Sequence, residues 1–411
     1  MTTATQKIPS GYKQTEIGMI PADWDVKKLG DLGEIKMCRR IFNHETKDVG
    51  IIPFYKIGTF GKEADAYISQ DLYDNYRHRF SFPKKGDVLI SAAGTIGRTI
   101  VYDGIPAYFQ DSNIVWIDNN EELISNGYLY YVFQIVKYNT EGGTIQRLYN
   151  SILKSTKFIC PTKPQQTAII SILSDTDALI TKTEKLIQKK KNIKQGAMQE
   201  LLTGKRRLAG SSGKWEVKKL GEIAQTTKGQ GLSKGKLSFS GKYPCILYGE
   251  LFTTYLEIIK DVYSKTDFEE GVLSKKGDIL IPGSTTTTGI DLAKASALLS
   301  DNILLGGDIN IIRKLRNVYD SIFLAYCLTH IYKNDIAQKT KGITIHHLQG
   351  KDLLDLEIVM PEEPEQVAIA TVLSDMDTEI EKLESQLTKY QNIKQGMMQT
   401  LLTGKIRLLT K

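Results

Sequence analysis

The sequence predicts an α+β protein built twice, with two mixed α/β globular halves, each with twisted β-sheets, separated by two long antiparallel helices that form a coiled coil. Two observations predict this fold class. Segments 161–208 and 361–408 align without a gap and are identical at 27 of 48 positions. Both segments also carry apolar residues at alternating spacings of four and three, which is typical of coiled-coil helices. We therefore expect a pseudo-twofold internal repeat.

Two shorter matches extend the repeat into the globular halves. Trp24-Asp-Val-Lys-Lys-Leu-Gly matches Trp215-Glu-Val-Lys-Lys-Leu-Gly, and Lys84-Lys-Gly-Asp matches Lys275-Lys-Gly-Asp, both at an offset of 191. The helical segments are offset by 200, so the halves differ by about nine residues. Between these matches the sequences diverge, as expected if each half does the same job on a different target.

The repeat also continues around the ends of the chain. The first copy runs from Leu208 into Trp215, whereas the corresponding continuation of the second copy is found at the N-terminus, residues 11–24. This arrangement resembles a ring that has been cut open. We therefore expect the two termini to lie near each other.

Prolines and glycines predict where the long helices begin and end. Pro164 and Pro364 are placed for a first helical turn, and Gly204 and Gly404 for a C-terminus. The predicted contact stripe of the second helix consists of Ile369, Leu373, Met376, Ile380, Leu383, Leu387 and Tyr390, followed after one irregular step by Ile393, Met397 and Leu401. The first helix has the matching stripe Ile169, Leu173, Thr176, Ile180, Thr183 and Ile187, followed by Ile193, Ala197 and Leu201.

The charges of the two helices indicate that they pair with each other. Residues 164–205 contain seven lysines and four acidic residues, and residues 362–405 contain eight acidic residues and four lysines. Each exposed ion pair contributes only a few tenths of a kcal/mol, so the pattern concerns partner choice more than stability. The alternative is two unrelated amphipathic helices, each packed on its own half.

Gly196 and Gly396 interrupt the helices at equivalent positions within Asn-Ile-Lys-Gln-Gly. A glycine inside a helix costs about 1 kcal/mol relative to alanine, so it requires a reason. One interpretation is close backbone packing. The other is a subunit-docking surface shared with Met198, Met397 and Met398, because methionine adapts well to interfaces.

Composition excludes several classes of protein. No run approaches the ~20 apolar residues of a membrane helix, and residues 1–10 lack the apolar block of a secretory signal. The four cysteines are scattered without a CxxC pair, which argues against a zinc site or disulfide framework and fits a reducing cytoplasm. The net charge of +7 is compatible with a polyanionic partner.

Within the halves we expect many short strands and one helix each. The candidate strands are 87–91, 99–102, 114–117, 278–281 and 310–312, and the candidate helices are 126–138 and 320–332. A Gly/Ser/Thr-rich loop follows the Lys-Lys-Gly-Asp strand in both halves, at 91–98 and 282–289. Such loops suit contact with phosphate or base edges, although a tight turn without a ligand is the alternative.

Catalytic motifs are missing from the sequence. It contains no GxGxxG, GxxxxGK[ST], HExxH or GxSxG, and no Asn-Pro-Pro-Tyr-like tetrapeptide of the kind that amino-methyltransferases use. The five histidines show no repeated placement. We therefore expect a non-catalytic chain. A self-sufficient methyltransferase with unusual motifs is an alternative.

Several motifs together resemble a known family. They are Tyr12-Lys-Gln-Thr-Glu-Ile-Gly-Met-Ile-Pro-Ala-Asp-Trp24, the Pro-x-x-x-x-Gln openings at Pro161 and Pro361, and the paired Leu-Leu-Thr-Gly-Lys-x-Arg-Leu endings. With these motifs, nearly the whole chain resembles the specificity subunit of type I restriction–modification enzymes. Openings in that family usually carry Glu before the Gln. Glu365 keeps this pattern and Gln165 departs from it, so the role of that glutamate is in doubt in the first repeat.

The resemblance implies two target-recognition domains, residues 1–160 and 209–360, and two spacer helices, residues 161–208 and 361–411. Each domain would read one half of a split, asymmetric site in double-stranded DNA. The helices would set the gap and dock two methyltransferase subunits, with restriction/translocase subunits further out. S-adenosylmethionine, ATP and magnesium would bind to those partners, with no cofactor or metal in this chain and no membrane. A bacterial or archaeal cytoplasm is the expected location.

Because DNA-reading residues vary within this family, candidates are chosen here by chemistry and loop position. Arg and Gln side chains can pair bidentately with guanine and adenine. The candidates in the first half are Arg39, Arg40, Arg77, Arg79, Arg98, Gln146 and Arg147. Those in the second half are Lys228, Gln230, Lys234, Lys236, Thr286, Lys341, His346 and His347. The alternative function is a two-headed coiled-coil adaptor that binds proteins rather than DNA.

Overall fold

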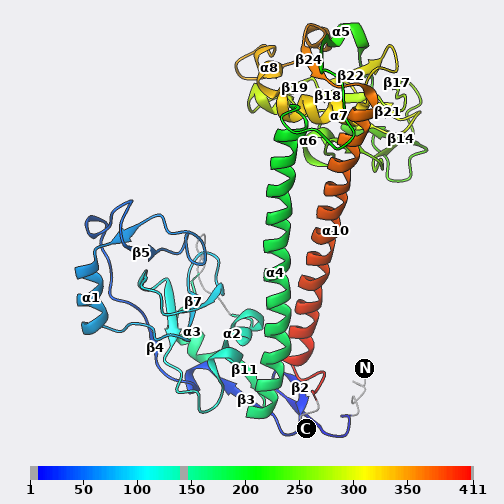
Figure 1. Cartoon of the computed structure of the whole chain (residues 1–411). Coiled ribbons are helices and arrows are strands. Elements are labelled where there is room, and N and C mark those ends of the chain that lie inside the picture. The colour runs from blue at the N-terminus through cyan, green and yellow to red at the C-terminus, as the bar shows by residue number, and fades with distance from the viewer. Residues whose placement is uncertain (1–7, 139–146, 409–411) are drawn as a thin grey trace. The chain divides into compact units, whose positions relative to one another are not determined.

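Two compact units make up the chain in the computed structural model, which describes residues 8–138 and 147–408. Unit 1 is discontinuous in sequence, because it combines Met1–Glu184 with Gln386–Lys411, whereas unit 2 is the continuous stretch Lys185–Ser385. Each unit contains one globular half together with part of both long helices (Figure 1). The predicted fold class is confirmed.

The long helices are α4 (Lys163–Leu201) and α10 (Glu363–Leu401), each of 39 residues. Pro164 and Pro364 lie in the first turns as predicted, and three residues after each helix a glycine adopts φ near +70°. In unit 1 the helices run antiparallel, since Asp177 of α4 is 2.6 Å from Lys394 of α10 while Thr176 is 3.9 Å from Met397. They do so in unit 2 as well, where Lys190 is 2.7 Å from Glu379 and Lys194 is 2.5 Å from Asp377.

The contact stripe of both helices differs from the predicted one near its end. Ile193 and Ile393 are 46% and 42% exposed, so their assignment to the stripe is wrong. The spacing of four and three instead continues without irregularity to Lys194 and Lys394, whose side chains are only 11% and 17% exposed. Apolarity favoured the isoleucines, but the uninterrupted helical period places the lysines at the interface.

In unit 1, a central antiparallel sheet has the order β4-β10-β7-β8, and a second sheet the order β6-β5-β9 with β5 and β9 parallel. Their strands are β4 (Ile35–Lys36), β5 (Ile52–Tyr55), β6 (Tyr67–Ile68), β7 (Val88–Ser91), β8 (Thr99–Val101), β9 (Tyr108–Phe109) and β10 (Ile114–Ile117). The remaining strands pair as β1 (Tyr12–Thr15) with β2 (Gly18–Pro21), and β3 (Asp25–Lys28) with β11 (Lys157–Cys160). The helices of this half are α1 (Gln70–Arg79), α2 (Asn126–Ile135) and α3 (Asn150–Ser155).

Unit 2 repeats this strand order on a different sequence and adds one edge strand to each sheet, β15 and β17. Its sheets have the orders β13-β22-β18-β20-β15 and β16-β14-β21-β17, and the strands β12 and β24 pair as β3 and β11 do. The strands are β12 (Glu216–Lys219), β13 (Ala224–Lys228), β14 (Tyr243–Ile246), β15 (Ile258–Ile259), β16 (Lys265–Thr266), β17 (Val272–Leu273), β18 (Ile279–Pro282), β19 (Ser284–Thr285), β20 (Ser296–Leu298), β21 (Leu304–Leu305), β22 (Ile309–Lys314), β23 (His346–His347) and β24 (Glu357–Met360). The helices are α5 (Leu220–Ile223), α6 (Glu250–Thr253), α7 (Ser321–Tyr326), α8 (Lys333–Gln338) and α9 (Gly350–Leu353).

The five predicted strands all form, and the two predicted helices begin where expected, as α2 and α7. The expectation of one helix in each half is wrong, however, because α1 and α8 are additional helices. Helix α1 was missed because it buries only Tyr73 and is otherwise polar, so it lacks an apolar stripe. Helix α7 continues directly into a π-helical turn at Cys327–Ile331, so the helical segment reaches nearly to the predicted end at residue 332.

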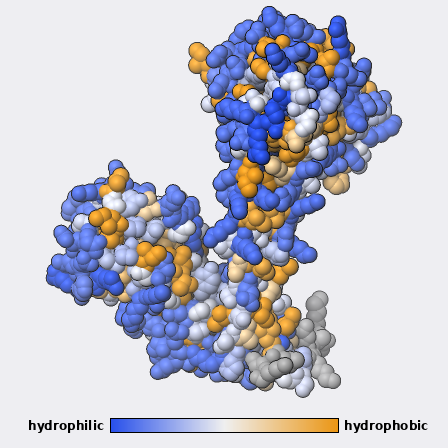
Figure 2. All heavy atoms as spheres, viewed as in Figure 1, coloured by the Kyte–Doolittle hydropathy of each residue, from blue (hydrophilic) through white to orange (hydrophobic). Residues whose placement is uncertain are grey.

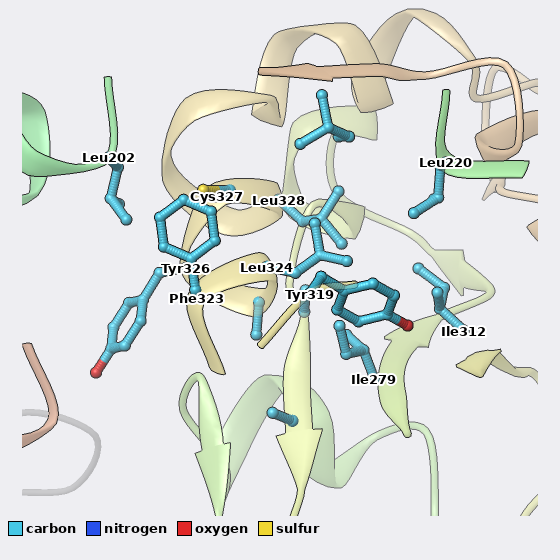
Figure 3. Close-up of a cluster of buried hydrophobic side chains, with 14 of the residues drawn as sticks. Leu202, Leu220, Ile279, Ile312, Tyr319, Phe323, Leu324, Tyr326, Cys327 and Leu328 are labelled. Carbon is cyan, nitrogen blue, oxygen red and sulfur yellow. The ribbon is translucent and has the colours of Figure 1, made fainter. Parts of the chain in front are cut away.

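Each core is closed by the end of a long helix. In unit 2, Leu202 from the end of α4 lies in the same cluster as Leu220 and the α7 residues Phe323 and Leu324 (Figure 3). In unit 1, Leu402 from the end of α10 packs with Trp24. In unit 1, Arg407 after α10 is 2.7 Å from Asp23 before β3. The segment that follows α10 therefore contacts the segment that precedes β3, while the two termini lie outside the described residues and their expected proximity stays a prediction.

Candidate nucleic-acid interface

The strand registers bring three polar segments to one end of the central sheet in each half. In unit 1, Ser91 at the end of β7 pairs with Ile114 at the start of β10, and β4 runs toward the same end. In unit 2, Pro282 at the end of β18 pairs with Ile309 at the start of β22, and Lys228 at the end of β13 lies beside Asn310. The Gly/Ser/Thr-rich loops therefore lie next to the loops that precede β10 and β22.

At this end of unit 1 there is an open cavity of about 350 Å³. Its lining includes the cations Arg40, Lys56 and Arg147 and the amides Gln110 and Asn113. Guanidinium and amide groups carry the donors and acceptors that suit base edges, and cations attract phosphate. The predicted residues Arg40 and Arg147 are thus brought together, although they are far apart in the sequence.

An aspartate holds one of these cations, Arg40. The Arg40 Nε donates to Asp111 Oδ2 at 2.9 Å, and the Arg40 side chain is 60% exposed while that of Asp111 is 16% exposed. The aspartate belongs to the loop before β10, where the next residue, Ser112, has φ +58°. The guanidinium is therefore oriented by a less accessible carboxylate while much of it faces solvent.

Unit 2 has an equivalent cation and aspartate. Lys228 Nζ lies 3.0 Å from Asp308 Oδ1, and Ser284 Oγ donates a hydrogen bond to the other carboxylate oxygen. Although burial opposes ionisation, the hydrogen bonds from Ser284 and Lys228 lower the pKa of Asp308. In both halves, then, a cation at the end of the first strand of the central sheet, or shortly after it, is paired with an aspartate before β10 or β22.

A short two-stranded sheet adds further polar groups to this end of unit 2. Strand β19 pairs with β23, so Ser284 faces His347 and Thr285 faces His346. Lys341 forms an isolated bridge with His347, and Thr286 follows β19 directly. Four of the predicted residues therefore lie on two adjoining segments, close to Asp308.

The other predicted arginines of the first half occupy different surroundings. The Arg39 and Arg79 guanidinium groups lie 5.3 and 5.7 Å from the centre of the Phe80 ring. Arg77 lies over the rings of Tyr73 and Phe82. Arg98 donates to the Phe60 carbonyl at 2.8 Å, which ties it to its own half. Gln146 lies outside the described residues.

In the second half, Gln230, Lys234 and Lys236 belong to the segment after β13. Lys236 Nζ donates to the Gly231 carbonyl and lies 3.3 Å from the centre of the Phe268 ring, so intramolecular contacts restrain it. The Gln230 backbone amide bonds to Leu305. These residues lie on the same connection as Lys228, which precedes them at the end of β13.

Sequence reasoning missed the two aspartates and the amides around them. Asp111, Gln110 and Asn113 form a short polar run between two strands, which is the signal that could have indicated a functional loop. Asp308 has no such run around it, because glycines precede it and apolar residues follow it. Asp111 and Asp308 reach the cations Arg40 and Lys228 only because strand pairing brings together segments that are far apart in the sequence.

The predicted docking residues separate into two groups. Gly196 and Gly396 are exposed, and a Cβ at either position would meet nothing within 4 Å, so close backbone packing does not explain them among the described residues. Met198 and Met398 are buried in the cores of units 2 and 1. Their side chains therefore pack mainly into these cores, with 9% and 7% of their surface exposed, and their part in docking stays a prediction. Met397 is partly buried.

Three further observations concern the surface, the apolarity of the helices and the potential to bind a metal ion. On the face seen in Figure 2, hydrophilic residues predominate, and hydrophobic residues form small patches on the globular halves and along the long helices. Among residues 8–138 and 147–408, no helix is long and apolar enough to cross a membrane. The same residues contain no cluster of three side chains suited to hold a metal ion.

Residues 21–195 and 212–390 both match the type I restriction modification DNA specificity domain. A Haemophilus influenzae protein assigned as a type I restriction enzyme specificity subunit, S.HindORF215P, is 56% identical over 155 residues, which are 38% of this chain and 40% of that protein. A Methanocaldococcus jannaschii protein assigned as the MjaX specificity subunit is 26% identical over 439 residues, covering 97% of both chains.

The fold agrees with these similarities. The crystal structure of a type I restriction–modification S subunit from M. genitalium superimposes with a TM-score of 0.61 at 15% identity, covering 98% of this chain and 99% of that one. The chain therefore belongs to the family of type I restriction–modification DNA specificity proteins. It carries two copies of the specificity domain, and its relatives are specificity subunits of type I restriction enzymes.

Proposed function

We propose that this chain selects the DNA site of a type I restriction–modification enzyme, with each globular half reading one part of a bipartite, asymmetric target. The observation that carries the proposal is the paired polar ends of the two central sheets. Both have a cation held by an aspartate, Arg40 with Asp111 and Lys228 with Asp308. The side chains around these pairs differ, with Gln110 and Asn113 in unit 1 and His346 and His347 in unit 2, as two readers of different sequences require.

In the first half, reading depends on the cavity that contains Arg40. The Arg40 guanidinium and the Gln110 and Asn113 amides can form paired hydrogen bonds with guanine or adenine in the major groove. In the second half, Thr286, His346 and His347 offer smaller donors and acceptors beside Lys228. Lysines near both ends supply phosphate contacts, which contribute most of the affinity and make it salt-dependent.

The long helices act in this proposal as a spacer and as a docking site for two methyltransferase subunits. Ile193 and Gly196 on α4, and Ile393 and Gly396 on α10, present the same exposed group twice, as two copies of one partner require. S-adenosylmethionine, ATP and magnesium then bind to the methyltransferase and restriction/translocase subunits. We place this assembly in the cytoplasm.

Selection of bound DNA from a random pool tests the proposal, using the chain with and without its methyltransferase partner. The expected result is a bipartite motif with a fixed gap. Recovery of no motif with the partner present contradicts the proposal and favours a protein-binding adaptor. Labelled S-adenosylmethionine should bind the complex with the methyltransferase partner and should not bind the isolated chain. Binding to the isolated chain would indicate a self-sufficient methyltransferase.

A further inference from the structure

Each unit contains the same three-residue network between a globular half and the paired helices. In unit 1, the Tyr131 hydroxyl donates to Asp177 Oδ2 at 2.8 Å, and Lys394 Nζ lies 2.6 Å from Asp177 Oδ1. The Lys394 ammonium group also lies 5.7 Å from the centre of the Tyr131 ring. The three residues come from α2, α4 and α10, so one carboxylate joins three helices.

Unit 2 has the same network with the roles of the long helices exchanged. The Tyr326 hydroxyl donates to Asp377 Oδ2, and Lys194 Nζ lies 2.5 Å from Asp377 Oδ1 and 5.1 Å from the centre of the Tyr326 ring. Here the tyrosine comes from α7, the aspartate from α10 and the lysine from α4. Tyr326 lies at the edge of the hydrophobic cluster with its hydroxyl directed away from it (Figure 3).

These charges occupy positions where a coiled coil usually has apolar residues. Lys194 and Lys394 continue the contact stripe of their helices, and their side chains are less exposed than those of Lys190 and Lys191, which also pair with acidic residues across the two helices. Removing one partner of such a pair is costly, because the remaining charge stays poorly hydrated. A slip of either helix by one turn separates both pairs at once. The networks therefore select one register over its neighbours.

A second contact fixes the same globular helices to the spacer. Gln166 accepts a hydrogen bond from the Ser125 amide and donates to the Leu123 and Pro161 carbonyls. Gln366 accepts from the Asp320 amide and donates to Pro361. Ser125 and Asp320 are the N-caps of α2 and α7. Each globular half is thus attached at two points, a buried glutamine and an aspartate 11 residues further along the long helix.

We propose that the Tyr131–Asp177–Lys394 and Tyr326–Asp377–Lys194 networks are positioning elements that determine the gap between the two DNA half-sites. The aspartate fixes the pairing of the helices through lysine and the orientation of the globular half through tyrosine. This inference rests on the proposed function, because it assigns these residues a part in spacing and none in base contact.

The test compares the full-length parent with two variants in complex with the methyltransferase partner. In the first, Tyr131→Phe and Tyr326→Phe remove the hydroxyl contacts while leaving the lysine–aspartate pairs. In the second, Lys194→Met and Lys394→Met remove the charges between the helices. Lys190→Met is the matched control, because Lys190 forms a more exposed ion pair, with Glu379, on the same helix. Random-pool selection reads the half-site sequences and the distribution of gaps separately.

We expect the half-site sequences to stay unchanged in both variants. The preference for the best gap over gaps one base pair longer or shorter should fall about tenfold, which is the effect of losing one charge-assisted hydrogen bond. The control should keep the gap preference of the parent. If the tyrosine variant folds and keeps the gap preference of the parent, the inference is overturned. This result would overturn the inference even if the lysine variant failed to fold. If the parent itself yields no bipartite motif, the proposed function fails instead.

Discussion

Arg207, beyond the end of α4, forms a two-pronged ion pair with Glu365, in the first turn of α10. The Nε to Oε1 and Nη2 to Oε2 distances are 2.5 and 2.6 Å, and the Glu365 side chain is only 6% exposed. Arg207 also donates to the Ser212 and Gly213 carbonyls. This one guanidinium therefore connects the end of one long helix, the following loop and the start of the other helix in unit 2.

The equivalent junction of unit 1 uses different bonds. Gln165 stands in place of Glu365 and accepts a hydrogen bond from the Trp24 indole, while Arg407 pairs with Asp23. In unit 2, the buried Trp215 indole nitrogen has no hydrogen-bond partner among the described residues. The departure of Gln165 from the usual glutamate is thus compensated in unit 1 by a tryptophan contact that unit 2 lacks.

A double-mutant cycle tests this exchange. Arg207→Ala should lower the Tm of the parent by several degrees, because it leaves a buried carboxylate without its cation. It should lower the Tm much less in a Glu365→Gln background, where the introduced amide can accept from Trp215 as Gln165 does from Trp24. Equal effects of Arg207→Ala in both backgrounds would mean that the ion pair does not couple the two residues.

The stability of unit 2 should depend on pH through Glu257. His330 Nε2 lies 2.6 Å from Glu257 Oε1, and although burial opposes ionisation, His330 and Lys194 lower the pKa of Glu257 from its ordinary 4.5. A lowered pKa in the folded state means that the carboxylate stabilises the fold above about pH 4.5 and that this contribution disappears as the pH falls through the folded value.

Glu257→Gln should therefore cost about 1–3 kcal/mol at neutral pH and weaken the loss of stability in acid. Denaturant unfolding measured between neutral and acidic pH checks this expectation. Glu379→Gln, which removes an exposed ion-pair partner, should leave the curve nearly unchanged. A parent-like acid dependence in Glu257→Gln would assign that dependence to other carboxylates.

Single substitutions should separate the two readers. Arg40→Ala should relax the selected sequence of one half-site and weaken binding about tenfold or more, since a good bidentate contact discriminates by about 1–3 kcal/mol. Lys228→Ala should affect only the other half-site. Lys182→Ala, on the exposed face of α4, provides the control. If Arg40→Ala altered both half-sites equally, separate reading by the two halves would be wrong.

The two exposed glycines should control partner binding without supporting the fold. Gly196→Leu and Gly396→Leu should each raise helix stability by up to about 1 kcal/mol, because a Cβ meets open space there. Each should also block one methyltransferase subunit by steric overlap. Mass measurement of the complex should show one partner bound instead of two, while Gly196→Ala keeps both. Full binding by both leucine variants would place the docking surface elsewhere.

Much of the architecture could be predicted because it follows from the spacing of apolar residues and from prolines and glycines close together in the sequence. The repeat, the helix boundaries at Pro164 and Pro364, and the strands β7, β8, β10, β18 and β22 of the central sheets follow from spacing and turn residues. The predicted contact stripe was wrong at Lys194 and Lys394, because the prediction favoured the neighbouring apolar residues Ile193 and Ile393. Only the tertiary partners Asp177 and Asp377 make a lysine favourable at that position.

The candidate site was less predictable, because it is assembled by strand pairing. Arg40 and Arg147 line one cavity although they are far apart in the sequence, and nothing near either residue indicates the other. The contribution of Asp111 and Asp308 likewise depends on register. Arg98 was also predicted to contact DNA because of its charge, but its guanidinium donates a hydrogen bond to the Phe60 carbonyl within its own half.

The discontinuity of unit 1 has a consequence for the order of folding during synthesis. Unit 2 is complete in sequence once Ser385 has been made, whereas the core of unit 1 includes Met398, Leu401 and Leu402. The half that is synthesised first therefore keeps an open hydrophobic face until Leu402 has left the ribosome. The usual order, in which N-terminal domains finish first, is reversed here. Loss of the final residues of α10 would expose the N-terminal half rather than the C-terminal one.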